Sequence, residues 1–243
     1  MNFLSKLFSL LLVVVLLSIV LGLGFLGMVP SLSRALGADK AWDLGIEYDS
    51  IDLANGRLKS RVKVTSLGFS GYFAETIQYS GQHFVETTFT QEELTALANS
   101  SEWKYYPVSE VQIKSNKDKS FEVCGLLKTS RLSGWLEATG GLDNLAARVL
   151  RLLGEGRRDI PFYLRVKIAV ENYEPDLDFQ RIEIGRLSLP AKIIARNKSQ
   201  LESFVKQRMD FVEGLAMKRL EVGERELRFV GYLPDLERVT ADD

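Results

Sequence analysis

The chain has 243 residues, of which 31 are basic and 32 acidic, so its net charge of −1 lacks the basic excess that is typical of nucleic-acid binding. Charged residues make up 26% and hydrophobic residues 46%, a balance typical of globular and not of disordered chains. The single cysteine, Cys124, and the single histidine, His83, exclude an intrachain disulfide, a CxxC site and a metal site with two histidines.

An uncharged apolar stretch runs from Leu7 to Val29, close to the N-terminus. A helix needs roughly 20 apolar residues to cross a bilayer, whereas the apolar core of a secretory signal covers roughly 7–15. We therefore predict a retained anchor over residues 1–30, with a signal cleaved at Ala35-Leu36-Gly37 as the alternative. The flanking positive charges are nearly balanced, and the very short N-terminal tail favours export of the rest of the chain. The expected location is the cell membrane, single-pass, with an extracytoplasmic C-terminal domain.

The residues after the anchor favour a connector and then short strands. Residues 31–44 form the predicted connector, and Gly45 opens the region of strands. Its strands are predicted from alternating or β-branched and aromatic residues at Arg61–Thr65, Tyr72–Tyr79 and Phe84–Phe89. We expect the last two of these strands to pair with each other.

A helix and a hairpin follow. Thr90 and Glu93 have the spacing of a capping box, which predicts a helix that ends near Asn99. Apolar and polar residues alternate on both sides of a polar turn at Asn116–Lys119, which predicts a β-hairpin.

The next part of the chain predicts one helix and two long strands. Apolar residues at helical spacing predict a helix over Asp143–Leu153. Strict alternation over Phe162–Glu171 predicts a half-buried strand, which favours an antiparallel sheet. In the strand-like stretch 177–189 the apolar residues alternate with polar ones, but the alternation slips by one residue near Gln180 and again at Gly185. These two shifts of the apolar phase predict two bulges.

The C-terminal part predicts a helix, a strand and a tail. A broad apolar stripe predicts the longest helix of the domain over Ser199–Leu220. The last predicted strand has Leu227, Phe229, Gly231 and Leu233 on one face. Residues 237–243 are predicted to be an acidic tail beyond the folded domain.

Together these elements predict an α+β fold, in which a long bent antiparallel sheet carries two or three packed helices and is preceded by one transmembrane helix. The predicted organisation is an anchor over 1–30, a connector over 31–44, a single extracytoplasmic domain over 45–236 and a tail over 237–243. About 200 residues are enough to bury one substantial core.

Few residue patterns suggest a reaction. Glu171, Glu174, Asp176 and Asp178 surround Pro175, where they could bind Ca²⁺, but the spacing lacks the glycine of an EF-hand loop, and a solvated connection is favoured. No GxSxG motif accompanies His83. We predict no catalytic residues, no metal and no cofactor.

Two basic or aromatic clusters have alternative interpretations. Trp103, Tyr105 and Tyr106 surround Lys104, a composition that suits either a membrane interface or packing at a sheet edge, and packing is favoured. Arg157-Arg158 could meet an anionic headgroup, although a solvated loop is favoured.

The order of elements after the anchor resembles that of known envelope proteins. The segments that carry this resemblance are FTQEELTAL, YYPVSEVQIKSN, FEVCGLL, PFYLRVKIAV, IEIGRLSLP, a long amphipathic helix and ELRFVGYLP. They resemble bacterial envelope proteins with one N-terminal anchor, such as the Bacillus YpmS-type proteins and the mycobacterial lipomannan-elongation factor group. Some of these are related to the tubular lipid-binding fold, so the resemblance implies a curved sheet around a long helix and an apolar groove that holds lipid. It covers roughly Phe84 to Pro234 and implies no catalytic residue.

The sequence therefore favours a membrane-anchored protein that binds lipid or another apolar ligand between a long amphipathic helix and a curved sheet, without covalent chemistry. The predicted groove residues are Leu145, Val149, Leu152, Phe204, Val205, Val212 and Leu215. The alternative is a scaffold or accessory subunit that binds another envelope protein or membrane complex, and a hydrolase that uses carboxylates is the weakest candidate. Expected partners are the membrane, a lipid ligand and an envelope protein, and not nucleic acid.

Overall fold

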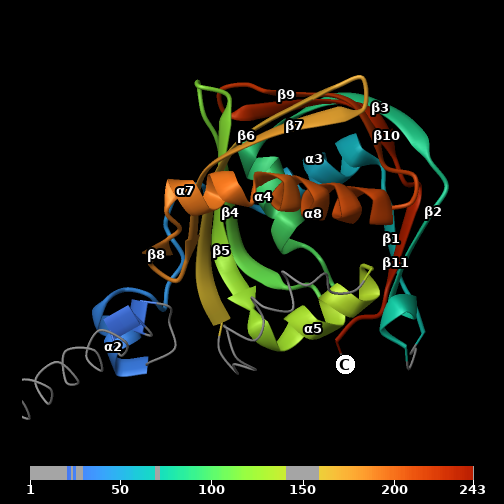
Figure 1. Ribbon diagram of the computed structural model, residues 1–243. Helices are drawn as coiled ribbons and strands as arrows, with labels where there is room; N and C mark the ends of the chain where they lie inside the picture. The colour runs from blue at the N-terminus through green and yellow to red at the C-terminus, as the bar shows by residue number, and fades with distance from the viewer. Residues whose placement is uncertain (1–20, 23, 26–29, 69–71, 141–158, 243) are drawn as a thin grey trace, which may run out of the picture.

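The computed structural model describes residues 21–22, 24–25, 30–68, 72–140 and 159–242, and these form an α+β fold around a curled antiparallel sheet (Figure 1). Within these residues no helix is both long enough and apolar enough to span a bilayer. Most of the predicted anchor over 1–30 lies outside the described residues. The predicted helix Asp143–Leu153, with groove residues Leu145, Val149 and Leu152, also lies outside them.

The larger sheet has eight strands, six of which follow the order β3-β10-β9-β6-β5-β4, while β7 pairs with β6 and β8 with β7. Its strands are β3 (His83–Thr90), β4 (Val108–Ser115), β5 (Ser120–Lys128), β6 (Asp159–Glu171), β7 (Glu174–Ile184), β8 (Leu187–Ser188), β9 (Ala216–Val222) and β10 (Glu226–Leu233). β5 and β9 share the edge of β6 that faces away from β7, because β5 pairs with residues up to Lys167 and β9 only with Val170 and Glu171. The sheet therefore branches at β6 and curls into a half-barrel.

The smaller sheet has three strands in the order β1-β11-β2. They are β1 (Lys63–Ser66), β2 (Ile77–Ser80) and β11 (Leu236–Val239). The expected pairing of Tyr72–Tyr79 with Phe84–Phe89 is wrong, because β2 pairs with β11 whereas β3 pairs with β10. Residues 237–239, expected in the tail, belong to the central strand of this sheet, and the following Thr240 is buried.

The described helices are α2 (Pro30–Ala35), α3 (Ser50–Ser60), α4 (Gln91–Asn99), α5 (Thr129–Ala138), α7 (Ala191–Arg196) and α8 (Lys198–Phe211), with a 3₁₀ turn η1 (Phe73–Glu75). α3 begins where the sequence predicts strands, so that prediction is wrong. Asp49 and Asp52 form a reciprocal capping box at its start, and Arg61 ends it in the left-handed region. α3 is therefore specified by its two ends and not by its weak apolar stripe.

Two local predictions are confirmed. At α4, the Thr90 hydroxyl accepts a hydrogen bond from the Glu93 amide at 3.1 Å, and the Glu93 carboxylate accepts one from the Thr90 amide at 2.9 Å. The hairpin of β4 and β5 turns at Asn116–Lys119. Both depend on neighbouring residues alone, which is why the sequence pattern is enough to predict them.

The bent strand is confirmed at one of its two predicted bulges. Arg165 of β6 pairs with Arg181 of β7, while the next residue, Val166, pairs with Phe179, so Gln180 is the additional residue. At Gly185 the chain makes the turn between β7 and β8 instead, with φ 66°.

The predicted helix Ser199–Leu220 is wrong in its C-terminal half. α8 ends at Phe211, and Gly214 turns the chain with φ 85° at a place where a Cβ would lie 2.3 Å from the Gly81 carbonyl oxygen. Residues 216–222 then form β9, where Leu220 pairs with Phe229 of β10. The apolar residues of this segment therefore face the sheet interior as a strand, since pairing with β10 overrides their helical spacing.

Candidate functional site

An apolar cavity of about 670 Å³ lies inside the curled sheet. The described residues that supply its walls come from the larger sheet, from α4 and the segment after α8, and at one side from α3 and the smaller sheet. β5 contributes Phe121 and Val123, and β6 contributes Val166 and Ile168. β9 and β10 contribute Met217, Leu220, Leu227, Phe229 and Leu233. We call this cavity the groove.

The groove follows from strand periodicity. Leu227, Phe229 and Leu233 occupy alternate positions of β10, and the side chains of alternate residues lie on one face of a sheet. Because the sheet curls, this face is concave, and α4 adds Leu94 and Leu97. The walls are therefore made largely of aliphatic and aromatic carbon, which suits an apolar ligand.

Of the four predicted groove residues that the structure describes, two line the cavity. Val212 and Leu215 line it from the segment after α8. Val205 packs against the buried cluster of Phe121, Val166, Leu177 and Val222. The ring of Phe204 points to a different neighbour, Trp135 of α5, at 6.1 Å between ring centroids. Figure 1 shows α8 crossing the open side of the curled sheet. This helix therefore borders the groove, while the segment that follows it supplies Val212 and Leu215 to the wall.

The sequence interpretation did not assign the strand and α4 residues to the site. The relevant signals were present in the one-sided strand with Leu227, Phe229 and Leu233 and in the capped helix with Leu94 and Leu97. Sequence reasoning treated the sheet as a cover for helices. In the structure the sheet itself forms most of the apolar wall.

One end of the groove is polar. Tyr79 of β2 and Glu237 of β11 line it, together with Ser60, Ser100, Ser101 and Arg57. No hydrogen bond or ion pair joins the Glu237 carboxyl group to another described residue. Burial raises the pKa of Glu237. Burial also raises the pKa of Tyr79 and raises the pKa of Tyr106 to about 12, and the nearby Glu237 charge adds to both shifts. Burial therefore favours the neutral forms of Tyr79, Tyr106 and Glu237.

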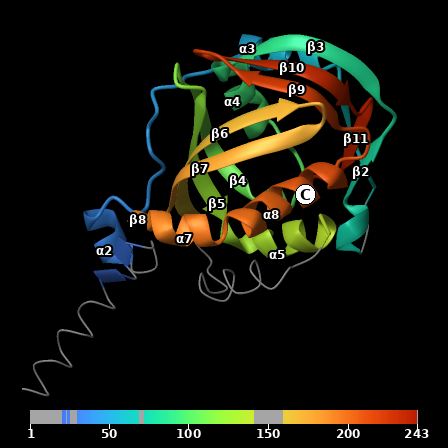
Figure 2. The same ribbon diagram turned by 45° about the horizontal axis from the view of Figure 1, so that its top comes forward.

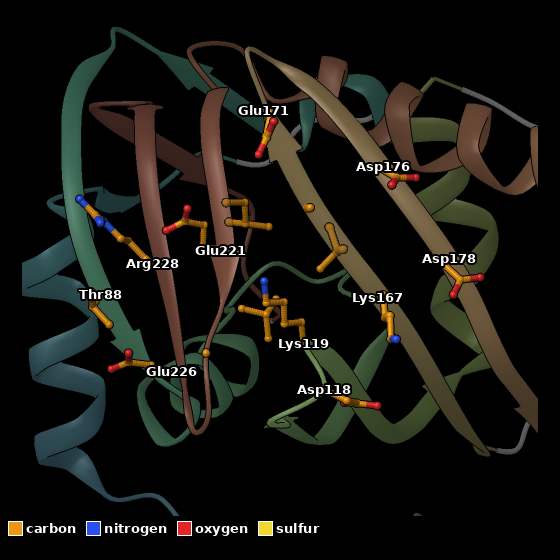
Figure 3. Close-up of a pocket in the computed structure, with 15 residues that line it drawn as sticks. Thr88, Asp118, Lys119, Lys167, Glu171, Asp176, Asp178, Glu221, Glu226 and Arg228 are labelled. Carbon is orange, nitrogen blue, oxygen red and sulfur yellow. The ribbon is translucent and has the colours of Figure 1, made fainter.

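A second, larger cavity of about 860 Å³ lies on the outer face, where β5 and β9 diverge along the edge of β6. Figure 3 shows charged side chains of both signs around it, including Lys119, Lys167, Glu221 and Arg228. At its rim the Ser120 hydroxyl and Arg165 lower the pKa of Asp118 to about 2. Apolar residues such as Ile168, Leu220 and Val222 line it between these charges. The charged rim suits contact with a charged partner.

The acidic residues do not form a metal site in the described part of the chain, where no group of three or more potential ligands comes together. Figure 3 shows Asp176 and Asp178 spaced along β7, away from Glu171 at the end of β6. Both nitrogens of His83 have partners, since Nδ1 lies 2.8 Å from Asp235 and Nε2 lies 2.9 Å from the Ser60 carbonyl oxygen. His83 thus joins β3 to the end of α3.

The aromatic cluster at Trp103 packs inside the fold. Trp103 is buried, and its indole N–H donates to the Thr76 hydroxyl at 3.1 Å. Tyr105 packs against the ring of Phe73 at 5.0 Å. Packing at a sheet edge, the favoured alternative, is therefore confirmed for Trp103. Arg157-Arg158 lies outside the described residues.

Comparisons of the chain with protein-family models, with curated proteins and with solved structures give no match. The resemblance in element order to the YpmS-type envelope proteins therefore stays a prediction.

Proposed function

We propose that the protein is a membrane-anchored, extracytoplasmic protein that binds lipid or another apolar ligand in the groove, without covalent chemistry. The observation that carries this proposal is the apolar cavity of about 670 Å³ inside the curled sheet. Its volume is within the range of roughly 300–1,000 Å³ that is common for ligand pockets. The uncharged stretch Leu7–Val29 supports the membrane anchor.

The ligand in this proposal is an amphiphile. Its apolar part lies against Ile168, Leu215 and Leu227, and its polar part lies near Tyr79 and Glu237. This placement differs from the one expected between a long helix and the sheet. α8 ends at Phe211, so the ligand lies between the sheet, α4 and the segment after α8.

The second candidate is a scaffold that binds another envelope protein. The charged outer cavity at the branch of the sheet favours it, because side chains such as Lys119, Lys167 and Glu226 could form ion pairs with a partner (Figure 3). The two candidates differ in the surface that carries function, so lipid retention separates them.

The test compares two matched leucine substitutions. The full chain is purified in detergent, and native mass spectrometry measures the lipid that each molecule retains. Leu215→Gln places an amide in the groove wall, whereas Leu201→Gln changes a half-buried leucine of α8 that does not line the groove. We expect a stoichiometric lipid on the wild type and on Leu201→Gln, and a large loss on Leu215→Gln.

Lipid that binds only to the anchor would be retained equally by all three proteins. Equal retention by the two variants, with both folded by circular dichroism, would therefore contradict a ligand in the groove. No lipid on folded wild type, even after incubation with host membranes, would favour the scaffold.

A further inference from the structure

The segment from Gly185 to Leu201 has a local charge that the whole chain lacks. It contains four basic residues, Arg186, Lys192, Arg196 and Lys198, and no acidic residue, although the net charge of the chain is −1. It includes β8, α7 and the start of α8. Lys198 forms an ion pair with Glu202 at 3.5 Å, while Lys192 and Arg196 are exposed. Cations next to one another on a surface attract anionic groups.

The same segment exposes large apolar side chains. Leu187 of β8 is 44% exposed and Ile193 of α7 is 48% exposed. The neighbouring Ile194 is only 6% exposed, so α7 is fixed to the domain by one side while its other side faces solvent. Apolar side chains among basic ones are the composition of helices that lie in a membrane interface.

The position of this segment is set by contacts to the N-terminal part of the chain. The Arg186 amide donates to the Phe25 carbonyl oxygen at 2.7 Å, and Phe25 lies in the stretch predicted to be the anchor. The Arg186 guanidinium donates to the Lys40 carbonyl oxygen at 3.0 Å. Figures 1 and 2 both show α2 beside β8 at one end of the molecule. The basic segment therefore lies at the level of the described end of the predicted anchor.

The connector is fixed to the domain at this end. The Arg186 guanidinium lies 4.4 Å from the centre of the Trp42 ring, and the Trp42 indole N–H donates to the Glu183 carboxylate at 2.9 Å. The Leu44 amide donates to the Gln112 side chain at 2.7 Å. A connector held by three such contacts fixes which side of the domain faces the membrane.

We propose that β8 and α7 form a second, peripheral membrane contact, in which Leu187 and Ile193 enter the interface of an anionic bilayer and Lys192 and Arg196 bind its phosphate groups. The proposal rests on the membrane anchor of the proposed function, and it assigns the domain a fixed orientation on the bilayer. It does not depend on a ligand in the groove.

The first test measures depth in the bilayer. The full chain is reconstituted into vesicles that contain phosphatidylglycerol, and an environment-sensitive dye is attached at Ile193→Cys. The control site is Glu174→Cys, at the opposite end of the β6–β7 hairpin, because the eleven residues of β7 extend about 35 Å. Unmodified protein corrects for labelling of Cys124, which is buried. We expect lipids with brominated chains to quench the dye at position 193 severalfold more than at position 174.

The second test separates charge from apolar contact. We expect Lys192→Glu/Arg196→Glu to reduce the quenching of the dye at position 193 in anionic vesicles. The matched control, Lys63→Glu/Arg238→Glu, reverses two exposed cations of the small sheet and should leave this quenching unchanged.

Flotation of the vesicles through a density gradient separates the failure of this proposal from the failure of the anchor. If the protein floats with vesicles but the dye at position 193 is quenched no more than at 174, the peripheral contact is wrong and the anchor stands. If the protein does not float with vesicles, the anchor and the peripheral contact are both wrong.

Discussion

Tyr79 and Glu237 lie directly opposite each other on the antiparallel strands β2 and β11, and both line the polar end of the groove. Tyr106 is also close enough for the Glu237 charge to raise its pKa. No cation is paired with the Glu237 carboxyl group among the described residues. Burial raises the pKa of this carboxyl group, because ionisation would place a charge in an environment poor in water.

This raised pKa predicts a pH-dependent effect of Glu237→Gln. Below about pH 4 the carboxyl group is protonated in both the folded and the unfolded chain, so it adds no pH dependence. As the pH rises toward the pKa of Glu237 in the folded state, the unfolded chain loses this proton before the folded chain does. The wild type therefore loses stability relative to the variant. Urea unfolding should therefore show a stability difference in favour of Glu237→Gln that grows with pH. A stability difference that stays the same at every pH would contradict this account. Glu213→Gln, at an exposed glutamate, is the matched control.

The contact between α3 and α4 predicts a steric effect at Gly56. A Cβ at this buried position would lie 2.9 Å from Leu97 Cγ, and Leu97 itself lines the groove. Gly56→Leu should therefore destabilise the fold by about 1–3 kcal/mol through overpacking, despite the better helix propensity of leucine. Ala54→Leu, at an exposed position of the same helix, should change stability by less than about 0.5 kcal/mol. Thermal unfolding of the two variants measures this difference, and equal effects would mean that the helices separate without cost.

The ion pair of Lys59 with Glu93 connects the same two helices. Lys59 Nζ lies 2.7 Å from the Glu93 carboxylate and 2.9 Å from the Thr88 carbonyl oxygen, and the Glu93 side chain is only 5% exposed. Lys59→Met would leave a buried carboxylate without its cation, so we expect a loss of about 2 kcal/mol in urea unfolding. Lys206→Met, at an exposed lysine of α8, serves as the control.

A second substitution tests whether the unpaired charge causes that loss. Glu93→Gln in the Lys59→Met background replaces the carboxylate with an amide whose oxygen can still accept the Thr90 N–H. We expect the double variant to be more stable than Lys59→Met alone. If adding Glu93→Gln instead lowered the stability of Lys59→Met by a similar amount again, the two side chains would act independently.

The elements predicted correctly from sequence are those whose signal is local. The Thr90 and Glu93 capping box predicts α4, and the shift of apolar phase predicts the bulge at Gln180, because both patterns depend on adjacent residues. α3 contains Gly56 in its middle and has little apolar stripe, so its sequence does not look helical without the Asp49 cap.

Pairing over long sequence distances is what the pattern does not contain. β2 pairs with β11, which lies more than 150 residues later in the sequence, and not with the adjacent β3; no local pattern indicates this choice. For the same reason the segment 212–222 keeps a helical spacing of apolar residues and yet turns at Gly214 to pair with β10. The groove is the result of this pairing, so sequence reasoning located Val212 and Leu215 but not the wall formed by β10.

The connector predicts a link between Trp42 and the reactivity of Cys124. The Cys124 thiol donates to the Trp42 carbonyl oxygen at 3.0 Å, and burial raises its pKa to about 11, so it should react slowly with alkylating reagents. Trp42→Ala removes the stacking with Arg186 and the hydrogen bond to Glu183, so the connector should open more often. We expect alkylation of Cys124 to accelerate roughly tenfold, whereas Tyr48→Ala, at another exposed aromatic residue, should leave the rate unchanged. An unchanged rate in Trp42→Ala would show that other contacts hold the connector over Cys124.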